Sequence, residues 1–551
     1  MVRFTNKMNE NYSHYNLNNN KALLDKLNTQ MSTKKKINEP MEDPTVSIRS
    51  LHFRGTLSEY NQYLGKNISD ALSWTDTTQT AIDTAKELMR SLKAEYTSAA
   101  NGTNETKDRW SYYEGMVNLV NEFFNTGNTT NENRYVFSNA RTGDSLTFSD
   151  KNFADRAKEN GGVFIDDHID TFKYKGITEY FKLEDVESYN YIARKGDTGS
   201  DGYSGITESE IASVGSDPLD PGIPHVDETN VQNVEVFRLR LSYKDLDKTQ
   251  EGLSGDPDKK SLTLYVKNGS TTDTYSVDII ENDYEIDQDS YGGNKVYLNV
   301  TTGNLLFGSD IKTKVTDALS GTGEVYFLYD KFRWETGDAK PEHFFDCVDV
   351  GMPDPIVYDD RAYKKEHPDT TEQDVIYNIG ESQIMKINTS AEDVYSLAAR
   401  RDLNEIYDAL TAKDNADKKM ATLKDMQEDT TRYPDEDSQR KIQELINAVE
   451  KEQEYLDNKI NKMLSNGITK SGGYFDTINL AGTNMGSIVN RLTLVKNRLT
   501  EHQTTVTAQA SDNENIDIST LAVEVNSATL SYGAALQVTG KISQQSLVNF
   551  L

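Results

Sequence analysis

The sequence predicts an α+β multidomain protein, in which the terminal helices pair into an α-helical coiled-coil stalk and a β-rich domain is inserted in the middle. Both ends of the chain place apolar residues at helical steps of three and four. Strand-like runs separated by Gly, Asp and Ser clusters occupy the middle, from about residue 151 to 345. The order is therefore helix, long helix, β insertion, long helix, helix. This symmetry favours pairing of the first helix with the last, and of the second with the second-last.

The last stretch, residues 516–551, is predicted to be a helix with Ser519 as its N-cap. Apolar or small residues recur at steps of four, three, four, three and seven, which places them along one seam of the helix. This seam consists of Leu521, Val525, Ala528, Tyr532, Ala535 and Ile542. An apolar end follows it at Leu547, Phe550 and Leu551. Because domain termini are usually polar, we expect this helix to dock on another surface.

The first stretch, residues 1–37, is the partner that the chain itself offers. It is predicted to be a polar helix on which Met8, Tyr12 and Tyr15 share one face. The apolar stripe continues at Leu23 or Leu24, Leu27 and Met31, with Leu24 taken as the interface residue. A single helix cannot bury its own stripe, so we expect the two terminal helices to pack together and to form an assembly interface.

Longer helices are predicted next to the terminal ones. Asp43 followed by Pro44 is a strong start signal, and a seam of three- and four-residue steps then continues to about residue 100. About 50 helical residues span about 75 Å, which favours a shaft over a short bundle helix. Further helices are predicted at about 106–124, 391–413, 438–465 and 485–509. The breaks between these elements are predicted at 38–44, 425–437, 466–473 and 512–515. The break at 466–473 is predicted because this stretch is rich in Gly.

The middle of the chain carries the strand signals, and we expect a sandwich there. The clearest strands are predicted at 234–241, 261–266, 295–300 and 324–329. The predicted domains are therefore 1–43 with 512–551 as a terminal coiled coil, 44–150 with 376–511 as a long-helix bundle with short hairpins, and 151–375 as a variable β-rich outer domain.

Composition excludes several partners. The net charge of −30 and a pI of about 4.7 argue against nucleic acid and against an anionic membrane surface. The sequence contains no run of about 18 apolar residues, so no membrane insertion is predicted. The first residues also lack the apolar region of a Sec signal peptide. The chain has one cysteine, Cys347, so no disulfide within the chain is expected.

The sequence predicts no catalytic, cofactor-binding or metal-binding residues. The seven His residues are not at metal-ligand spacing, and no His-Glu-x-x-His, phosphate-binding Gly loop or Gly-x-Ser-x-Gly is present. Residues 166–168 are interpreted as a solvated acidic loop. The segment that starts at Asp245 begins like a Ca²⁺ loop, but it lacks the Gly at its sixth position and has Asp256 at its twelfth in place of Glu.

Several segments resemble the flagellin family of bacterial flagella. Ser32 to Asn38 follows a leucine-rich stretch and is similar to the family's Ser-x-Gly-x-x-Ile/Val-Asn, with Lys34 in place of Gly. Residues 38–44 look like the Asn-x-Pro-Ser-Asp-Asp-Pro of the junction branch of the family, hook-associated protein 3, with Met41 and Glu42 as departures. Residues 133–137 resemble the Tyr-x-Phe part of the Asn-x-x-Tyr-x-Phe-x-Gly turn of that branch, with Asn139 at the Gly. Residues 546–551 resemble its Ser-Leu-Leu-Asn-Tyr-Leu terminus.

This resemblance, which covers about 1–150 and 376–551, implies a structural protein without enzyme activity or cofactors. It implies export in an unfolded state through the flagellar type III channel, with help from a flagellar export chaperone. The implied partners are further copies of the chain in a ring or helical lattice, hook-associated protein 1 and flagellin. The implied location is outside the cell, at the hook–filament junction of the bacterial flagellum. Two alternatives stay open, namely flagellin itself and a filament-family protein with an adhesive insert.

Overall fold

The structure is a computed structural model that describes residues 6–102, 104–159, 172–194, 208–214, 231–250, 262–269, 271–286, 295–352 and 354–548. The chain divides into two compact units. One, here called the terminal unit, contains Met1–Leu72, Tyr377–Met385 and Val489–Leu551. The other, here called the middle unit, contains Ser73–Ile376 and Lys386–Ile488. The predicted division into three domains stays a prediction.

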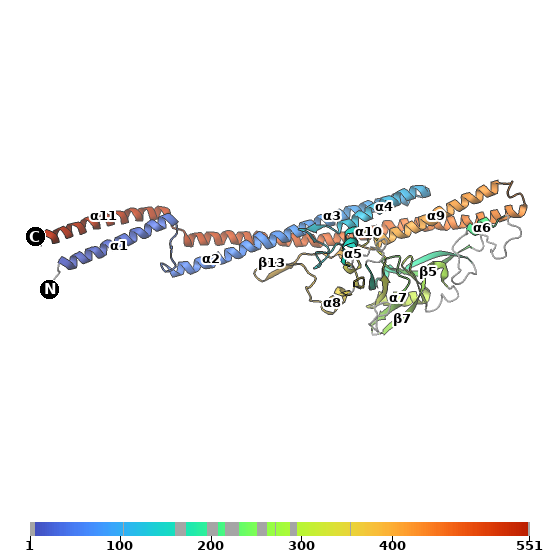
Figure 1. Cartoon of the computed structure of the whole chain (residues 1–551), viewed down its shortest axis with the longest axis horizontal. Coiled ribbons are helices and arrows are strands. Elements are labelled where there is room, and N and C mark those ends of the chain that lie inside the picture. The colour runs from blue at the N-terminus through green and yellow to red at the C-terminus, as the bar shows by residue number, and fades with distance from the viewer. Residues whose placement is uncertain are drawn as a thin grey trace. The chain divides into compact units, whose positions relative to one another are not determined.

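The terminal unit pairs the two ends of the chain. Helix α1 (Asn6–Thr33) lies beside α11 (Ile518–Val548), as Figure 1 shows next to the labels N and C. The predicted pairing of the terminal helices is confirmed. The N-cap of α11 differs from the prediction, because the Asp517 carboxylate accepts the Ser519 N–H at 2.9 Å and the Thr520 hydroxyl at 2.9 Å.

Helix α2 (Pro44–Gln62) begins as predicted. The Asp43 side chain accepts the N–H groups of Thr45 and Val46, and Pro44 occupies the first helical position. One π-helical turn, η1 (Tyr63–Asn67), separates α2 from α3 (Ile68–Ala99), so the predicted single helix over 44–100 is interrupted by one wider turn. Helix α2 packs against the last part of α10 through Asn61–Gln503 at 2.7 Å and the Asn513 amide to the Val46 carbonyl at 3.0 Å. The hairpin of β13 (Ile376–Gly380) and β14 (Gln383–Lys386) contacts α10 through Gln383 and Arg498.

The middle unit contains α4 (Thr106–Thr126), α9 (Ala398–Glu428), most of α3, and the part of α10 (Glu436–Glu514) that ends at Ile488. The prediction of a break at 466–473 is wrong, because α10 continues through it. Gly467 faces the ring of Tyr96 on α3, and Gly482 faces Ile82 on the same helix. The glycine at 467 therefore permits close helix packing and does not end the helix.

Ten of the described strands form one sheet in the order β12-β11-β3-β10-β6-β7-β8-β9-β5-β4. The neighbouring pairs are antiparallel except β7 with β8, which are parallel. The expected sandwich differs from this arrangement, because all ten strands belong to one sheet, in which residues 271–276 of β7 pair with β6 and residues 277–280 pair with β8. Helix α7 (Ser309–Ser320) packs on this sheet through buried Ile311, Val315 and Ala318. The predicted strands at 234–241, 261–266, 295–300 and 324–329 are confirmed.

The strands of this sheet are β3 (Tyr174–Phe181), β4 (Glu187–Arg194), β5 (Val231–Arg240), β6 (Thr263–Asn268), β7 (Thr271–Ile280), β8 (Val296–Asn299), β9 (Asn304–Phe307), β10 (Glu324–Lys331), β11 (Asp346–Asp349) and β12 (Ile356–Tyr358). The smaller elements are β1 (Thr130–Asn131), β2 (Arg134–Tyr135), α5 (Asp150–Glu159), α6 (Glu208–Ala212), α8 (Asp360–Glu366) and the short helices η2 (Leu183–Asp185), η3 (Asp283–Glu285), η4 (Pro341–His343) and η5 (Ala391–Asp393). The fold is thus α+β, with helices at the ends of the chain and the sheet in the middle.

Candidate assembly interface of the terminal helices

Half of the predicted interface residues meet between α1 and α11. Leu27 of α1 and Leu521 and Ala528 of α11 are buried and form a small apolar cluster. The predicted residues that pack around this cluster are Leu24, Met31 and Val525, and Ile516 joins them. The sequence pattern therefore located the apolar centre of this helix pair, but an assembly role for these residues stays a prediction.

Further along α11, the seam residues are less buried and a buried polar residue lies among them. Tyr532, Ala535 and Ile542 are partly buried. Between the last two lies Thr539, which is 7% exposed and whose hydroxyl is 2.7 Å from the hydroxyl of Ser13 on α1. Thr539 was not predicted from the sequence, although the seven-residue step from Ala535 to Ile542 skips the helical position four residues after Ala535. A polar residue at that position was the available signal.

The apolar end lies largely outside what the structure describes. Phe550 and Leu551 fall outside the described residues, and the side chain of Leu547 is not described either. Their predicted role in assembly therefore stays a prediction.

Both terminal helices also carry apolar side chains that point away from the pair. On α1, Met8, Tyr12 and Tyr15 are exposed, so this predicted face does not pack on α11. On α11, Val523 and Leu530 are 69% and 76% exposed, on the side opposite the seam. Among the residues of α11 whose side chains the structure describes, the other exposed large apolar ones are Ile518, Leu536 and Val538. We call these five residues of α11 its outward apolar set. A helix with apolar residues on opposite sides is typical of a helix that is surrounded by other helices.

The two breaks of the terminal unit meet in a short backbone contact. The Lys36 N–H donates to the Glu514 carbonyl at 2.8 Å, and the Ile516 N–H donates to the Lys34 carbonyl at 3.2 Å. The predicted breaks at 38–44 and 512–515 shift accordingly, because α1 ends at Thr33 and α10 continues to Glu514. An isolated antiparallel β-bridge between Lys35 and Asn515 therefore joins the two connections between helices.

The Glu514 carboxylate is the charged centre of this joint. It accepts hydrogen bonds from Arg54 Nε and Nη2, both at 3.0 Å, from Lys35 Nζ at 2.8 Å and from the Ser50 hydroxyl. The hydrogen bonds from Arg54, followed by those from Lys35 and Ser50, lower the pKa of Glu514 to about 2. Because Lys35 lies between α1 and α2 while Ser50 and Arg54 belong to α2, Glu514 connects the end of α10 to both segments.

Two departures from the family pattern fall at unusual backbone positions. Lys34 has φ of +59° and Asn139 has φ of +51°, both in the left-handed region that favours glycine. These are the two positions where the resembling motifs carry Gly. The backbone at both positions therefore keeps the conformation that explains a Gly in the motif, although the side chains differ.

The described residues contain no group of three or more His, Cys, Asp or Glu that could hold a metal ion. Residues 166–168 lie outside the described part of the chain, as does the segment after Gln250 that would complete the loop from Asp245. Cys347 is buried. No helix in the described ranges is long and apolar enough to cross a membrane.

Comparison with known proteins matches both ends of the chain. Residues 4–142 match the bacterial flagellin N-terminal helical region, and residues 469–551 match the bacterial flagellin C-terminal helical region. No curated protein matches the chain. Both matched regions include a terminal helix, whereas the sheet lies between them.

Among solved structures, a Vibrio parahaemolyticus protein described as a flagellar hook-associated protein is similar at 10% identity, over 86% of this chain and 100% of that chain, with a TM-score of 0.31. FlgL of Xanthomonas campestris is similar at 10% identity, over 81% of this chain and 98% of that chain, with a TM-score of 0.20.

Proposed function

We propose that the chain is a member of the flagellin family, whose members are structural parts of the bacterial flagellum, and that it is the adaptor subunit at the hook–filament junction. In this role it lies between hook-associated protein 1 and flagellin. It leaves the cell unfolded through the flagellar type III channel, with an export chaperone as its partner inside the cell. Residues 38–44, 133–137 and 546–551, which resemble the junction branch more than flagellin, support this choice within the family.

The observation that carries an assembly function is the outward apolar set of α11. Pairing with α1 buries Leu521 and Ala528 but leaves Val523 and Leu530 largely exposed. Exposing a leucine rather than burying it costs about 2 kcal/mol, so a neighbour that covers these side chains stabilises the helix pair. Further copies of the chain in a ring or helical lattice supply such a neighbour, since each copy brings its own terminal helices.

Immunolabelling of intact flagella tests where the protein lies. An antibody against residues 151–375 is applied to flagella, with flagella from a strain that lacks the gene as control, and the label is located by electron microscopy. We expect a narrow band where the hook meets the filament. Label along the whole filament would show that the chain is a flagellin, and flagella without label would contradict both roles.

A further inference from the structure

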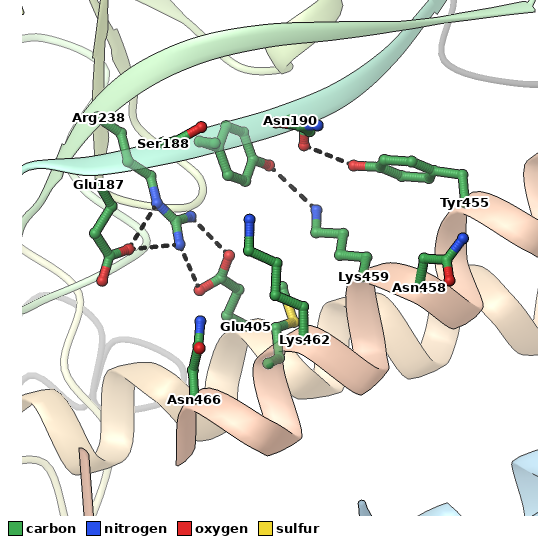
Figure 2. Close-up of a pocket in the computed structure, with 12 residues that line it drawn as sticks. Glu187, Ser188, Asn190, Arg238, Glu405, Tyr455, Asn458, Lys459, Lys462 and Asn466 are labelled. Carbon is green, nitrogen blue, oxygen red and sulfur yellow. Dashed lines mark hydrogen bonds and ion pairs between the residues drawn. The ribbon is translucent and has the colours of Figure 1, made fainter. Parts of the chain in front are cut away.

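A cavity of about 370 Å³ lies in the middle unit, between the β4–β5 edge of the sheet and helices α9 and α10 (Figure 2). Its volume is within the range of pockets that bind small molecules. The side chains that concern its chemistry are Glu187, Tyr189, Arg238, Glu405, Lys459 and Lys462. Asn458 and Asn466 of α10 add two amide groups to the lining. The cavity thus lies where the β-rich part of the chain meets the long helices.

The walls of the cavity are fixed by ion pairs and hydrogen bonds. Arg238 donates to Glu405 at 2.6 Å and to Glu187 at 3.0 Å. The Tyr455 hydroxyl donates to the Asn190 carbonyl at 2.6 Å, which ties α10 to β4. Burial opposes ionisation of Glu405, but the guanidinium groups of Arg238 and Arg240 hold its pKa well below the usual range. Both carboxylates are therefore ionised and already engaged by cations.

Unlike these two carboxylates, Lys459 and Lys462 of α10 have no oppositely charged partner in direct contact among the described residues. Lys459 and Lys462 lie one helical turn apart, and Figure 2 shows both ammonium groups between the helix and β4. Among the described residues, neither has an ion pair within 4.0 Å, whereas nearby Lys470 contacts Glu187 at 2.7 Å. Lys459 Nζ donates to the Tyr189 hydroxyl at 3.3 Å, and it lies 4.9 Å from the centre of the Tyr189 ring and 5.9 Å from the centre of the Tyr455 ring. Burial lowers the pKa of Lys459, so its ammonium is poorly solvated.

The charges that line the cavity sum to a positive value. Arg238, Lys459 and Lys462 contribute three positive charges, and Glu187 and Glu405 contribute two negative ones. In a chain with a net charge of −30, a cavity with a net charge of +1 is an exception. An anion between the two ammonium groups would relieve their mutual repulsion and replace the water that burial removes from Lys459.

We propose that this cavity binds a small anion through a carboxylate or phosphate group held between Lys459 and Lys462. The Asn458 and Asn466 amides can donate to, or accept from, hydroxyl groups next to that anionic group. An acidic sugar and free phosphate share this chemistry. The site uses residues of α9 and α10 as well as of the sheet, so it requires the full chain.

Calorimetric titration of the full-length protein at low ionic strength tests the proposal. The probes are sodium glucuronate, inorganic phosphate and, as the neutral control, glucose. We expect at least one of the two anions to bind and glucose not to bind. Tighter binding of glucuronate would identify an acidic sugar, and equal or tighter binding of phosphate would identify an anion site without a sugar preference.

Matched variants locate the binding. Lys462→Gln removes an exposed side chain and should weaken anion binding about threefold to tenfold. Lys496→Gln, an exposed lysine elsewhere on α10, should leave it unchanged. Lys459→Gln should weaken binding further, with its thermal unfolding checked against the parent protein. Absence of binding by both anions, equal binding of glucose, or unchanged affinity of Lys462→Gln would overturn the proposal.

Discussion

Gly467 is the residue where sequence and structure differ most clearly. The Gly-rich composition of 466–473 predicted a break, yet α10 is continuous there. A Cβ added at Gly467 would lie 2.4 Å from the nearest ring atom of Tyr96, which is 2% exposed. A Cβ added at Gly473 would meet nothing within 4 Å. Composition alone cannot separate these two glycines, because the difference depends on a helix almost 400 residues earlier in the chain.

The two glycines should therefore respond in opposite ways to alanine. Gly467→Ala should lower the free energy of unfolding by about 1–3 kcal/mol, because overpacking against Tyr96 exceeds the gain in helix propensity. Gly473→Ala should raise it by up to about 1 kcal/mol, since only the propensity gain applies. Urea unfolding of both variants checks the difference. Two equal changes in stability would show that Tyr96 does not constrain α10.

Lys34 and Asn139 show what the sequence could reveal at the residue scale. Both were recognised as departures from a motif that carries Gly, and both have positive φ. Thr539 was missed, because a seam of apolar residues does not reveal a polar member whose partner, Ser13, lies more than 500 residues away in the chain. Positions that depend on local backbone geometry were thus accessible, and positions that depend on a distant partner were not.

At the scale of elements, the joint between α10 and α11 depends on Glu514. Its pKa of about 2 in the folded protein lies below the ordinary value of 4.5, so the unfolded chain takes up a proton at higher pH than the folded one. The stabilisation is therefore complete above about pH 4.5 and is lost as the pH falls toward 2. The joint should open more readily in that window.

Glu514→Gln should weaken the joint at neutral pH by about 1–2 kcal/mol, because it removes the charge that Arg54 and Lys35 bind. Hydrogen exchange of the amides around residue 514 measures this local opening. Between pH 4.5 and 2, the parent protein should lose this protection and the variant should change less. Glu501→Gln, an exposed carboxyl on the same helix, is the control. The same pH dependence in the parent and in Glu514→Gln would contradict the assignment.

Most helices and strands could be predicted from the sequence, whereas the order of the strands in the sheet could not. The α1–α11 pair follows from steps of three and four along each helix, and the Asp43–Pro44 start is local chemistry. The order of the ten strands depends on pairs such as β3 with β10, which are far apart in sequence. A run of alternating residues identifies a strand but not its neighbour, so an expected sandwich and the observed single sheet have the same sequence signal.

At the scale of the whole molecule, the terminal helices present more apolar surface than their pairing buries. The outward apolar set of α11 includes Leu530, which is 76% exposed, and the seam on the other side is already used by α1. Helices of this kind are marginal alone and gain stability from neighbours. An account in which the chain assembles through its ends explains why an apolar helix faces solvent in a single copy.

Incorporation into flagella tests this account most directly. A strain that lacks the gene is complemented with Leu530→Asp or with the matched variant Leu530→Met, and the protein is quantified in purified flagella and in the culture medium. Because Leu530 is 76% exposed in a single copy, both variants should be exported and should fold. We expect Leu530→Met to be incorporated and to restore filaments. Leu530→Asp should accumulate in the medium, with at least a tenfold loss from flagella. A tenfold loss corresponds to about 1.4 kcal/mol of assembly free energy, and burying an unpaired carboxylate against a neighbour costs more than that. Normal incorporation of Leu530→Asp would contradict assembly through the outward face of α11.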